Sequence, residues 1–114
     1  SLLRVLDPRN WQTPGFEQGD GDPVVCVSWR DADAYSQWRW RRDGHRYRLA
    51  TAAEAARLPA APGERAVSEW RADCGDSCAR RAATGPSWRT DGRSRSLVAE
   101  RGYDDVGFRL VRDL

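Results

Sequence analysis

The sequence predicts a mixed α+β domain built from two short helices, several short antiparallel strands and much irregular loop. The first predicted helix follows an N-cap at Ser28 or Asp31 and runs to about Arg42, and Asp43-Gly44 ends it. Thr51 and Glu54 have the spacing of a capping box, in which each side chain bonds the other's backbone N–H, and this predicts a second helix ending near Leu58. In the second half of the chain the apolar runs are short and separated by turn residues, which is typical of strands.

The length fits one domain with one core, because the chain has only 114 residues. Although 32% of the residues are charged, six Trp, three Tyr and two Phe supply large apolar surfaces, so we expect an aromatic-rich, loop-rich core and not disorder. We therefore expect a single domain over residues 1–114. Because the sequence opens without an initiator Met, we also expect a fragment or the C-terminal part of a larger protein.

The segment before the first helix divides into a loop and a short strand. Ser1–Asp22 is broken by Pro and Gly, which predicts an irregular packed loop with Trp11 and Phe16 as anchors. The β-branched run Val24–Val27 predicts a short buried strand, in which Cys26 would be an inert, buried thiol.

The first helix should bury an aromatic face. Ser28 or Asp31 is its expected N-cap, because both residue types accept a hydrogen bond from the first turn. Ala34, Tyr35 and Trp38 share one face, and we expect that face to pack on the core. The charged residues of the helix lie elsewhere on it: Asp31, Asp33, Arg39 and Arg42.

The strands are expected at short β-branched or alternating runs. These runs are Arg46–Leu49, Val67–Arg71, Arg80–Thr84, Ser94–Arg101 and the closing Val106–Val111. Asp73–Cys78 predicts a turn between two of them, and Pro59–Glu64 predicts a linker.

The charge pattern excludes two classes of partner. All 19 basic residues are Arg, the sequence also has 17 acidic residues, and the formal net charge is only +2. Because the two signs are interspersed, the chain lacks the one-sided positive field that binds nucleic acid. No apolar run approaches the roughly 20 residues that a membrane helix needs, so we expect no membrane insertion by this segment.

Six ordered blocks of the sequence resemble one known family, the formylglycine-generating enzyme (sulfatase-modifying factor) domain. Any one block would be weak evidence, but six in the family's order are specific. The resemblance implies a variant of the C-type lectin fold. The blocks are Asn10–Phe16, Pro23–Trp38, Tyr47–Glu54, Val67–Trp70, Gly85–Trp88 and Gly107–Arg112.

The chain departs from this family where the family does its chemistry. In the active enzymes a cysteine pair just after the block that matches Gly85–Trp88 binds copper and oxidises a substrate cysteine, but Ser87–Arg95 contains no Cys. The family's usual N-terminal strands and a long calcium-bearing insertion also have no counterpart. We therefore expect a second polypeptide segment or domain to complete the fold, and copper only if the oxidase function holds.

Calcium is a second cofactor that the resemblance raises. In the family part of the calcium site is an Asn-x-x-Glu-Trp segment, whose Glu and Trp match Glu69 and Trp70, but Ala66 stands at the Asn position. Calcium prefers six or more oxygen ligands, so one carboxylate is a weak candidate. We expect instead that an arginine, Arg109 or Arg93, holds Glu69, because a half-buried carboxylate needs a partner. No cofactor is expected overall.

The remaining cysteines and the only histidine give no metal centre. Cys74 and Cys78 enclose a turn-forming spacer, so they can form a small disulfide loop in an oxidising compartment. His45 lies in the turn after the first helix, where we expect it to be exposed. With one His, four-coordinate zinc is excluded, and so is the histidine-held iron of the related sulfoxide synthases.

The candidate ligand-binding surface is the stretch that lines the substrate cleft in the family. It offers an aromatic ring, several guanidinium groups and acids, which suits a peptide or an anionic small ligand. For Trp88 we expect packing into the core, and for Arg89, Asp91 and Arg93 exposure. The full set of candidates is Trp88, Arg89, Asp91, Arg93, Arg95, Arg101, Tyr103 and Asp104.

The function that follows is a noncatalytic module that binds a protein or a small-molecule ligand, as part of a larger bacterial signalling or sensor protein. One alternative is the variable ligand-binding protein of a diversity-generating retroelement, whose diversified residues precede the closing Gly-Phe-Arg. Another is a formylglycine-generating-type oxidase, or a related maturation enzyme that does not use the cysteine pair. For the latter, Glu69, Asp91 and Tyr103 are the candidate acids and bases. The sequence does not decide between bacterial cytoplasm and periplasm.

Overall fold

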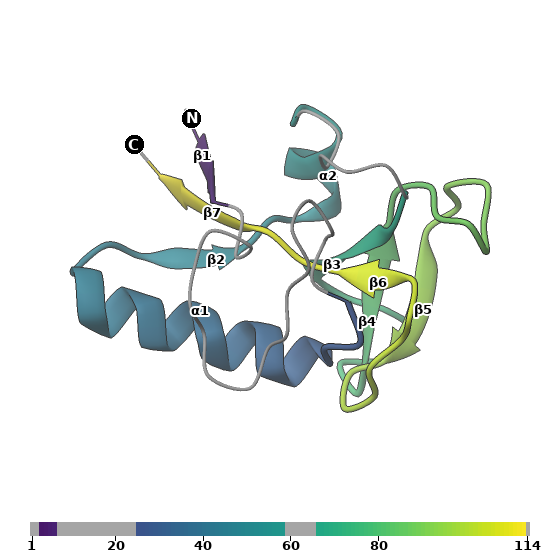
Figure 1. The fold of residues 1–114 in the computed structure, drawn as a ribbon, viewed down its shortest axis with the longest axis horizontal. Helices are drawn as coiled ribbons and strands as arrows, with labels where there is room; N and C mark the ends of the chain where they lie inside the picture. Colours follow the sequence, from purple (N-terminus) through teal and green to yellow (C-terminus); the bar gives the residue numbers. More distant parts are fainter. Residues whose placement is uncertain (1–2, 7–24, 59–65, 114) are drawn as a thin grey trace.

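The structure is a computed structural model that describes residues 3–6, 25–58 and 66–113. These residues form two helices and seven strands, and the strands make two sheets that meet at the centre of the molecule (Figure 1). The predicted anchors Trp11 and Phe16, and the predicted linker Pro59–Glu64, lie outside the described residues. The elements are β1 (Leu3–Leu6), α1 (Trp29–Asp43), β2 (Tyr47–Leu49), α2 (Ala52–Ala55), β3 (Ser68–Cys74), β4 (Arg80–Thr84), β5 (Arg95–Val98), β6 (Val106–Gly107) and β7 (Leu110–Asp113).

The predicted α+β class is confirmed, but the closing strand is not continuous. One sheet has the antiparallel order β1-β7-β2, and the other has the order β5-β4-β3-β6, in which β6 runs parallel to β3. The single strand predicted over Val106–Val111 is therefore split between two sheets. The split falls at Phe108 and Arg109, because the Phe108 ring packs on Tyr35 and the Arg109 guanidinium reaches Glu69.

The prediction of a loop throughout Ser1–Asp22 is wrong at residues 3–6. These residues form β1, which pairs along its whole length with β7, from Leu3 opposite Asp113 to Leu6 opposite Leu110. A four-residue strand is not stable alone and depends on its partner. Because that partner lies at the other end of the chain, the local pattern could not reveal it.

Helix α1 begins and ends as its capping residues predict. The Ser28 hydroxyl accepts a hydrogen bond from the Asp31 amide (3.0 Å), and Gly44, with φ of 76°, donates its amide to the Trp40 carbonyl (2.8 Å). The helix therefore begins after Ser28, one of the two predicted caps, and its last residue, Asp43, is one position beyond the predicted end near Arg42.

The buried face of α1 differs from the predicted one. Tyr35 is buried, but Ala34 is exposed and Trp38 retains 38% exposure. The buried positions follow the helical period instead, and they include a charged side chain because Arg39 donates to Asp43 (2.8 Å) and lies over the Tyr47 ring. They are Trp29, Ala32, Tyr35, Ser36 and Arg39.

The predicted buried strand Val24–Val27 is not formed at residues 25–27, although Val27 is buried; Val24 lies outside the described residues. Val25 makes only an isolated bridge to Gly107, and Cys26 is exposed. Cys26 adopts a left-handed backbone with φ of 63°, which turns its side chain out of the strand direction. This turn is held because the Cys26 amide donates to the Tyr103 carbonyl (3.0 Å).

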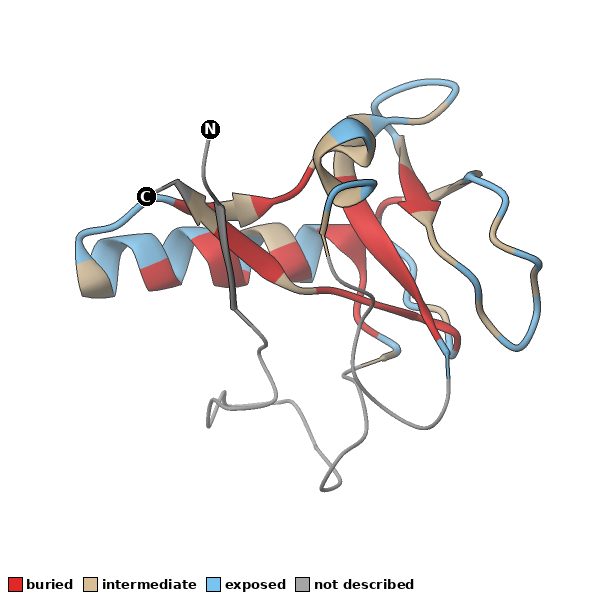
Figure 2. Cartoon of the chain, turned by 90° about the horizontal axis from the view of Figure 1, so that it is seen from above, coloured by how far each residue is buried: buried red, intermediate tan, exposed pale blue. Residues whose placement is uncertain are grey.

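The predicted aromatic-rich core is confirmed, and two indole N–H groups fix its geometry. Trp70 is fully buried and donates to the Val27 carbonyl (2.8 Å), while Trp29 donates to the Arg71 carbonyl (2.9 Å). Figure 2 shows the buried positions on α1 and on the central strands. The core therefore ties the start of α1 to β3.

Helix α2 is a single turn fixed by polar contacts. The predicted capping box is present, because the Thr51 hydroxyl and the Glu54 carboxylate each accept from the other residue's amide. Glu54 also receives a bidentate ion pair from Arg48 (2.6 and 2.7 Å). The helix ends at Ala55 and not near Leu58. The Arg48 hydrogen bonds are the main reason that the pKa of Glu54 is lowered to about 2.

This ion pair makes stability dependent on acid. Because the folded pKa of Glu54 lies below its ordinary 4.5, the stabilisation is complete above pH 4.5 and is lost as pH falls toward 2. Urea unfolding at pH 5.5 and pH 2.5 should show a larger loss for the wild type than for Glu54→Gln, by roughly 2 kcal/mol. Equal losses in the two proteins would show that the pair does not contribute.

Candidate functional site

The β4–β5 loop (residues 85–94) carries the most exposed aromatic ring of the candidate surface. Gly85 and Gly92 have φ of 94° and 105°, and between them Ser87 and Thr90 exchange backbone hydrogen bonds (3.2 Å each), so the loop is a defined turn. Trp88 occupies its corner with 48% exposure. The expectation that Trp88 packs into the core is therefore wrong, because the turn closes at Ser87 and projects the next side chain outward.

Trp88 is part of a preorganised group that includes two charged residues. The Arg89 guanidinium lies 4.1 Å from the centre of the Trp88 ring and makes a bidentate pair with Asp104 (3.0 and 2.8 Å). Hydrogen bonding to Arg89 lowers the pKa of Asp104, and the same bond raises the pKa of Arg89. We call these three residues the Trp88 surface; their mutual contacts orient a ring and a cation at the protein surface.

The buried residue Asp105, which was not among the predicted site residues, anchors this loop. Asp105 is 1% exposed and accepts hydrogen bonds from Arg95 (2.6 Å) and from the Ser87 hydroxyl (2.7 Å). Arg95 also donates to the Ser68 hydroxyl (3.1 Å), so it joins the loop to β3 and does not face a ligand. Only its proximity to the closing Gly-Phe-Arg block could have pointed to Asp105.

The other predicted site residues are scattered. Tyr103 stacks edge-on against Trp70, and its hydroxyl accepts the Val98 amide (3.1 Å), so it supports the core. Arg101 is exposed but follows the far end of β5 (Figure 1). Asp91 and Arg93 are exposed as predicted, and their 3.7 Å contact is a weak surface ion pair.

The Glu69 carboxylate is occupied by arginine, as predicted. It is 5% exposed, and Arg109 binds both of its oxygens (2.7 and 2.9 Å), while Arg71 lies 3.6 Å away. Burial is the main cause that lowers the pKa of Arg71. A calcium ion does not fit here, because it would have to displace one guanidinium and lie close to another. Across residues 25–58 and 66–112, no three His, Cys, Asp or Glu side chains form a group that could hold a metal.

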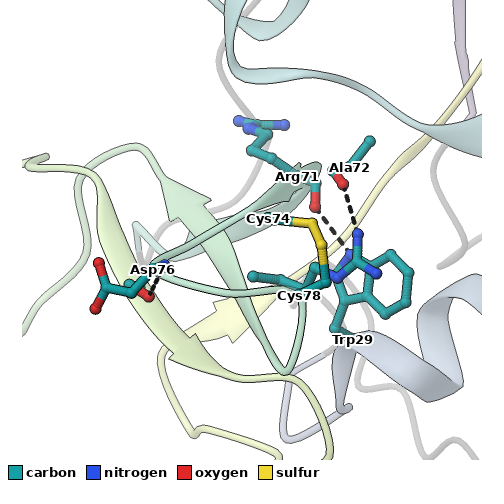
Figure 3. The surroundings of a disulfide bond; sticks show 8 residues. Trp29, Arg71, Ala72, Cys74, Asp76 and Cys78 are labelled. Atoms are coloured by element: carbon teal, nitrogen blue, oxygen red, sulfur yellow. Dashed lines mark hydrogen bonds between the residues drawn. A yellow bond between two sulfur atoms is a disulfide. The ribbon is translucent and has the colours of Figure 1, made fainter.

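The cysteines do not fit a copper centre either. Cys74 and Cys78 form a disulfide with a Cα–Cα distance of 4.6 Å (Figure 3). It lies beside Trp29, whose ring is covered by the Arg81 guanidinium at 3.8 Å. The disulfide closes one end of the β3–β4 hairpin, whereas the β4–β5 loop begins at the other end, where the Ser68 hydroxyl bonds the Gly85 carbonyl. The two sulfurs are therefore bonded to each other and lie outside the stretch that corresponds to the family's catalytic one.

Together, the two sheets, the long helix and the arginine-filled carboxylate site define a small α+β domain of the C-type lectin-like kind. The chain belongs to the sulfatase-modifying factor enzyme 1-like domain family, whose model matches residues 4–66, more than half of the sequence. The match ends before β3, so it does not include the Trp88 surface.

The fold resembles that of PvdO from Pseudomonas aeruginosa. The TM-score is 0.68 at 20% sequence identity, and the likeness covers 98% of this chain and 72% of PvdO. At this identity the likeness establishes the fold alone. None of the curated proteins matches the chain. Neither helix in the described part of the chain has the length and apolar character that crossing a bilayer requires.

Asp104 and Asp105 are neighbours in the sequence, but Asp104 is exposed and Asp105 is buried. Matched substitutions at the two positions therefore test whether Asp105 anchors the β4–β5 loop. Asp105→Asn should lower the free energy of unfolding by about 3 kcal/mol, because it leaves the Arg95 charge partly buried without its partner. Asp104→Asn should leave stability nearly unchanged, since its ion pair is exposed. Urea unfolding of both variants measures this; equal effects would contradict the anchoring role of Asp105.

Proposed function

We propose that this chain is a noncatalytic binding module and that the Trp88 surface contacts its ligand, a segment of another protein. The observation that carries the proposal is the 48% exposed indole of Trp88, stacked by a guanidinium that Asp104 holds in place. Trp and Arg are the side chains most enriched among residues that dominate binding energy. Holding them in position before binding reduces the entropy lost on association.

The state of the family's chemical groups supports binding over oxidation. The β4–β5 loop has no thiol, Cys74 and Cys78 are bonded to each other, and Glu69 is occupied by Arg109. An oxidase that uses a free thiolate pair needs both sulfurs reduced and adjacent to the substrate. This chain supplies neither condition in the stretch that corresponds to the catalytic one.

The hydrogen bonds beneath the β4–β5 loop also favour a binding role. The Asp105 carboxylate accepts part-buried hydrogen bonds from Ser87 within the β4–β5 loop and from Arg95 at the start of β5. A loop anchored in this way presents the same surface to every partner molecule, which favours specific recognition. The host of the module, in this proposal, is a larger bacterial signalling or sensor protein.

A random peptide library displayed on phage and selected on the wild-type domain tests the proposal. Selected peptides should lose at least tenfold in affinity for Trp88→Ala and for Arg89→Ala, as expected for residues at the centre of an interface. Trp38→Ala is the matched control, because Trp38 is also an exposed Trp but lies on α1. Peptides that bind all variants equally, or a failure to select any peptide, would contradict the proposal.

The oxidase alternative has a separate test. A cysteine-containing peptide, incubated with the domain, copper(I) and oxygen, should keep its thiol as measured by mass spectrometry. Conversion of that cysteine to formylglycine would overturn the noncatalytic assignment, whatever the peptide selection shows.

A further inference from the structure

A concave site is formed by residues of α1 and the start of β2. These two elements lie at the other end of the molecule from the β4–β5 loop that carries Trp88 (Figure 1). Its volume is about 530 Å³, within the range of small-molecule sites. One wall is a single stripe of α1 with the spacing i, i+3, i+4, i+7, i+8, and the other is the start of β2. We call it the α1–β2 groove; its lining residues are Asp33, Ser36, Gln37, Trp40, Arg41, Gly44, Arg46, Tyr47 and Arg48.

The groove combines an exposed aromatic ring with cations. Trp40 is 44% exposed, and the Arg46 guanidinium lies 5.6 Å from the centre of its ring. Arg41 follows Trp40 on the same helix and lines the same groove. Within the described residues, neither Arg41 nor Arg46 pairs with a carboxylate, so both guanidinium groups keep their hydrogen-bond donors for a ligand.

The charges of the groove sum to a net positive value, because the guanidinium groups of Arg41 and Arg46 outnumber its one carboxylate, that of Asp33. Arg48 is bound by Glu54, and the Asp33 carboxylate accepts from Gln37 (2.9 Å). The helix C-terminus at Gly44 contributes a partial negative charge, but Arg41 and Arg42 in the last turn offset it. The groove therefore favours an anion over a cation.

We propose that the α1–β2 groove binds a small planar anion, an aromatic carboxylate. An aromatic ring can stack on Trp40 or on the planar Arg46 group, and a carboxylate matches the fork of donors of Arg41. This site is independent of the Trp88 surface, because it uses different elements and a different ligand chemistry.

The test is a titration of the isotope-labelled full chain with benzoate, followed by NMR. Benzoate should cause saturable shifts that are largest in the second half of α1 and in β2, with a Kd in the millimolar range expected of so small a ligand. Benzamide has the same shape without the charge and should bind at least tenfold more weakly. Arg41→Gln and Arg46→Gln should each weaken benzoate about tenfold, the loss of one charge-assisted hydrogen bond.

Arg93→Gln is the matched control, because Arg93 is an exposed arginine of the β4–β5 loop with a side chain 85% exposed. It should leave benzoate binding unchanged, and so should Trp88→Ala. Equal affinity for benzoate and benzamide, shifts centred on Trp88, or shifts that grow linearly without saturation would each overturn the proposal. Unchanged amide spectra of the ligand-free variants show that they are folded.

Discussion

The buried ion pair between Glu69 and Arg109 lies where the chain leaves one sheet and enters the other. Glu69 belongs to β3 and is paired in the ladder with Gly107 of β6, whereas Arg109 immediately precedes β7. The bidentate bonds between the two side chains therefore fix the crossing between the sheets. Phe108, between the two strands, can then enter the core, and β7 is placed to pair with both β1 and β2. A charge pair at this depth is stabilising only while both partners are present, because either charge alone would be buried without compensation.

The same pair shapes the functional character of the domain. The resemblance made Glu69 only a weak candidate for a calcium ligand, and its carboxylate is instead bound by Arg109, with Arg71 3.6 Å away. A second buried carboxylate is also paired with an arginine, because Arg95 binds Asp105 beneath the β4–β5 loop. With these groups committed to structure, the exposed chemistry is carried by Trp88 with its guanidinium partner and by the basic groove beside α1. We propose both as recognition surfaces, and for this reason we favour binding over redox catalysis as the function of the domain.

The parts of this structure that were predictable from sequence depend on neighbours in the chain or on the family resemblance. The cap of α1 at Ser28 and the capping box of α2 involve residues three apart, so a local pattern encodes them. The pairing of β1 with β7 joins segments near the two ends of the sequence, so no local pattern predicted it. The left-handed turn at Cys26 depends on a bond to the distant Tyr103 carbonyl, and it converted an expected buried thiol into an exposed one. The exposure of Trp88 was mispredicted for a related reason. It depends on the turn at Ser87, which a hydrogen bond to the buried Asp105 anchors. No sequence pattern distinguishes Asp105 from its exposed neighbour Asp104.

We infer that the Glu69–Arg109 pair joins the two sheets without a metal ion, and a double-mutant cycle is the most direct test of this role. The free energies of unfolding of Glu69→Gln, Arg109→Met and the double variant would be measured by urea titration in the presence of a metal chelator. Each single substitution should lower the free energy of unfolding by about 3–5 kcal/mol. The double variant should lose less than the sum of the two single losses, by about 2 kcal/mol or more. Losses that add within about 0.5 kcal/mol, or a wild type that the chelator itself destabilises, would contradict it.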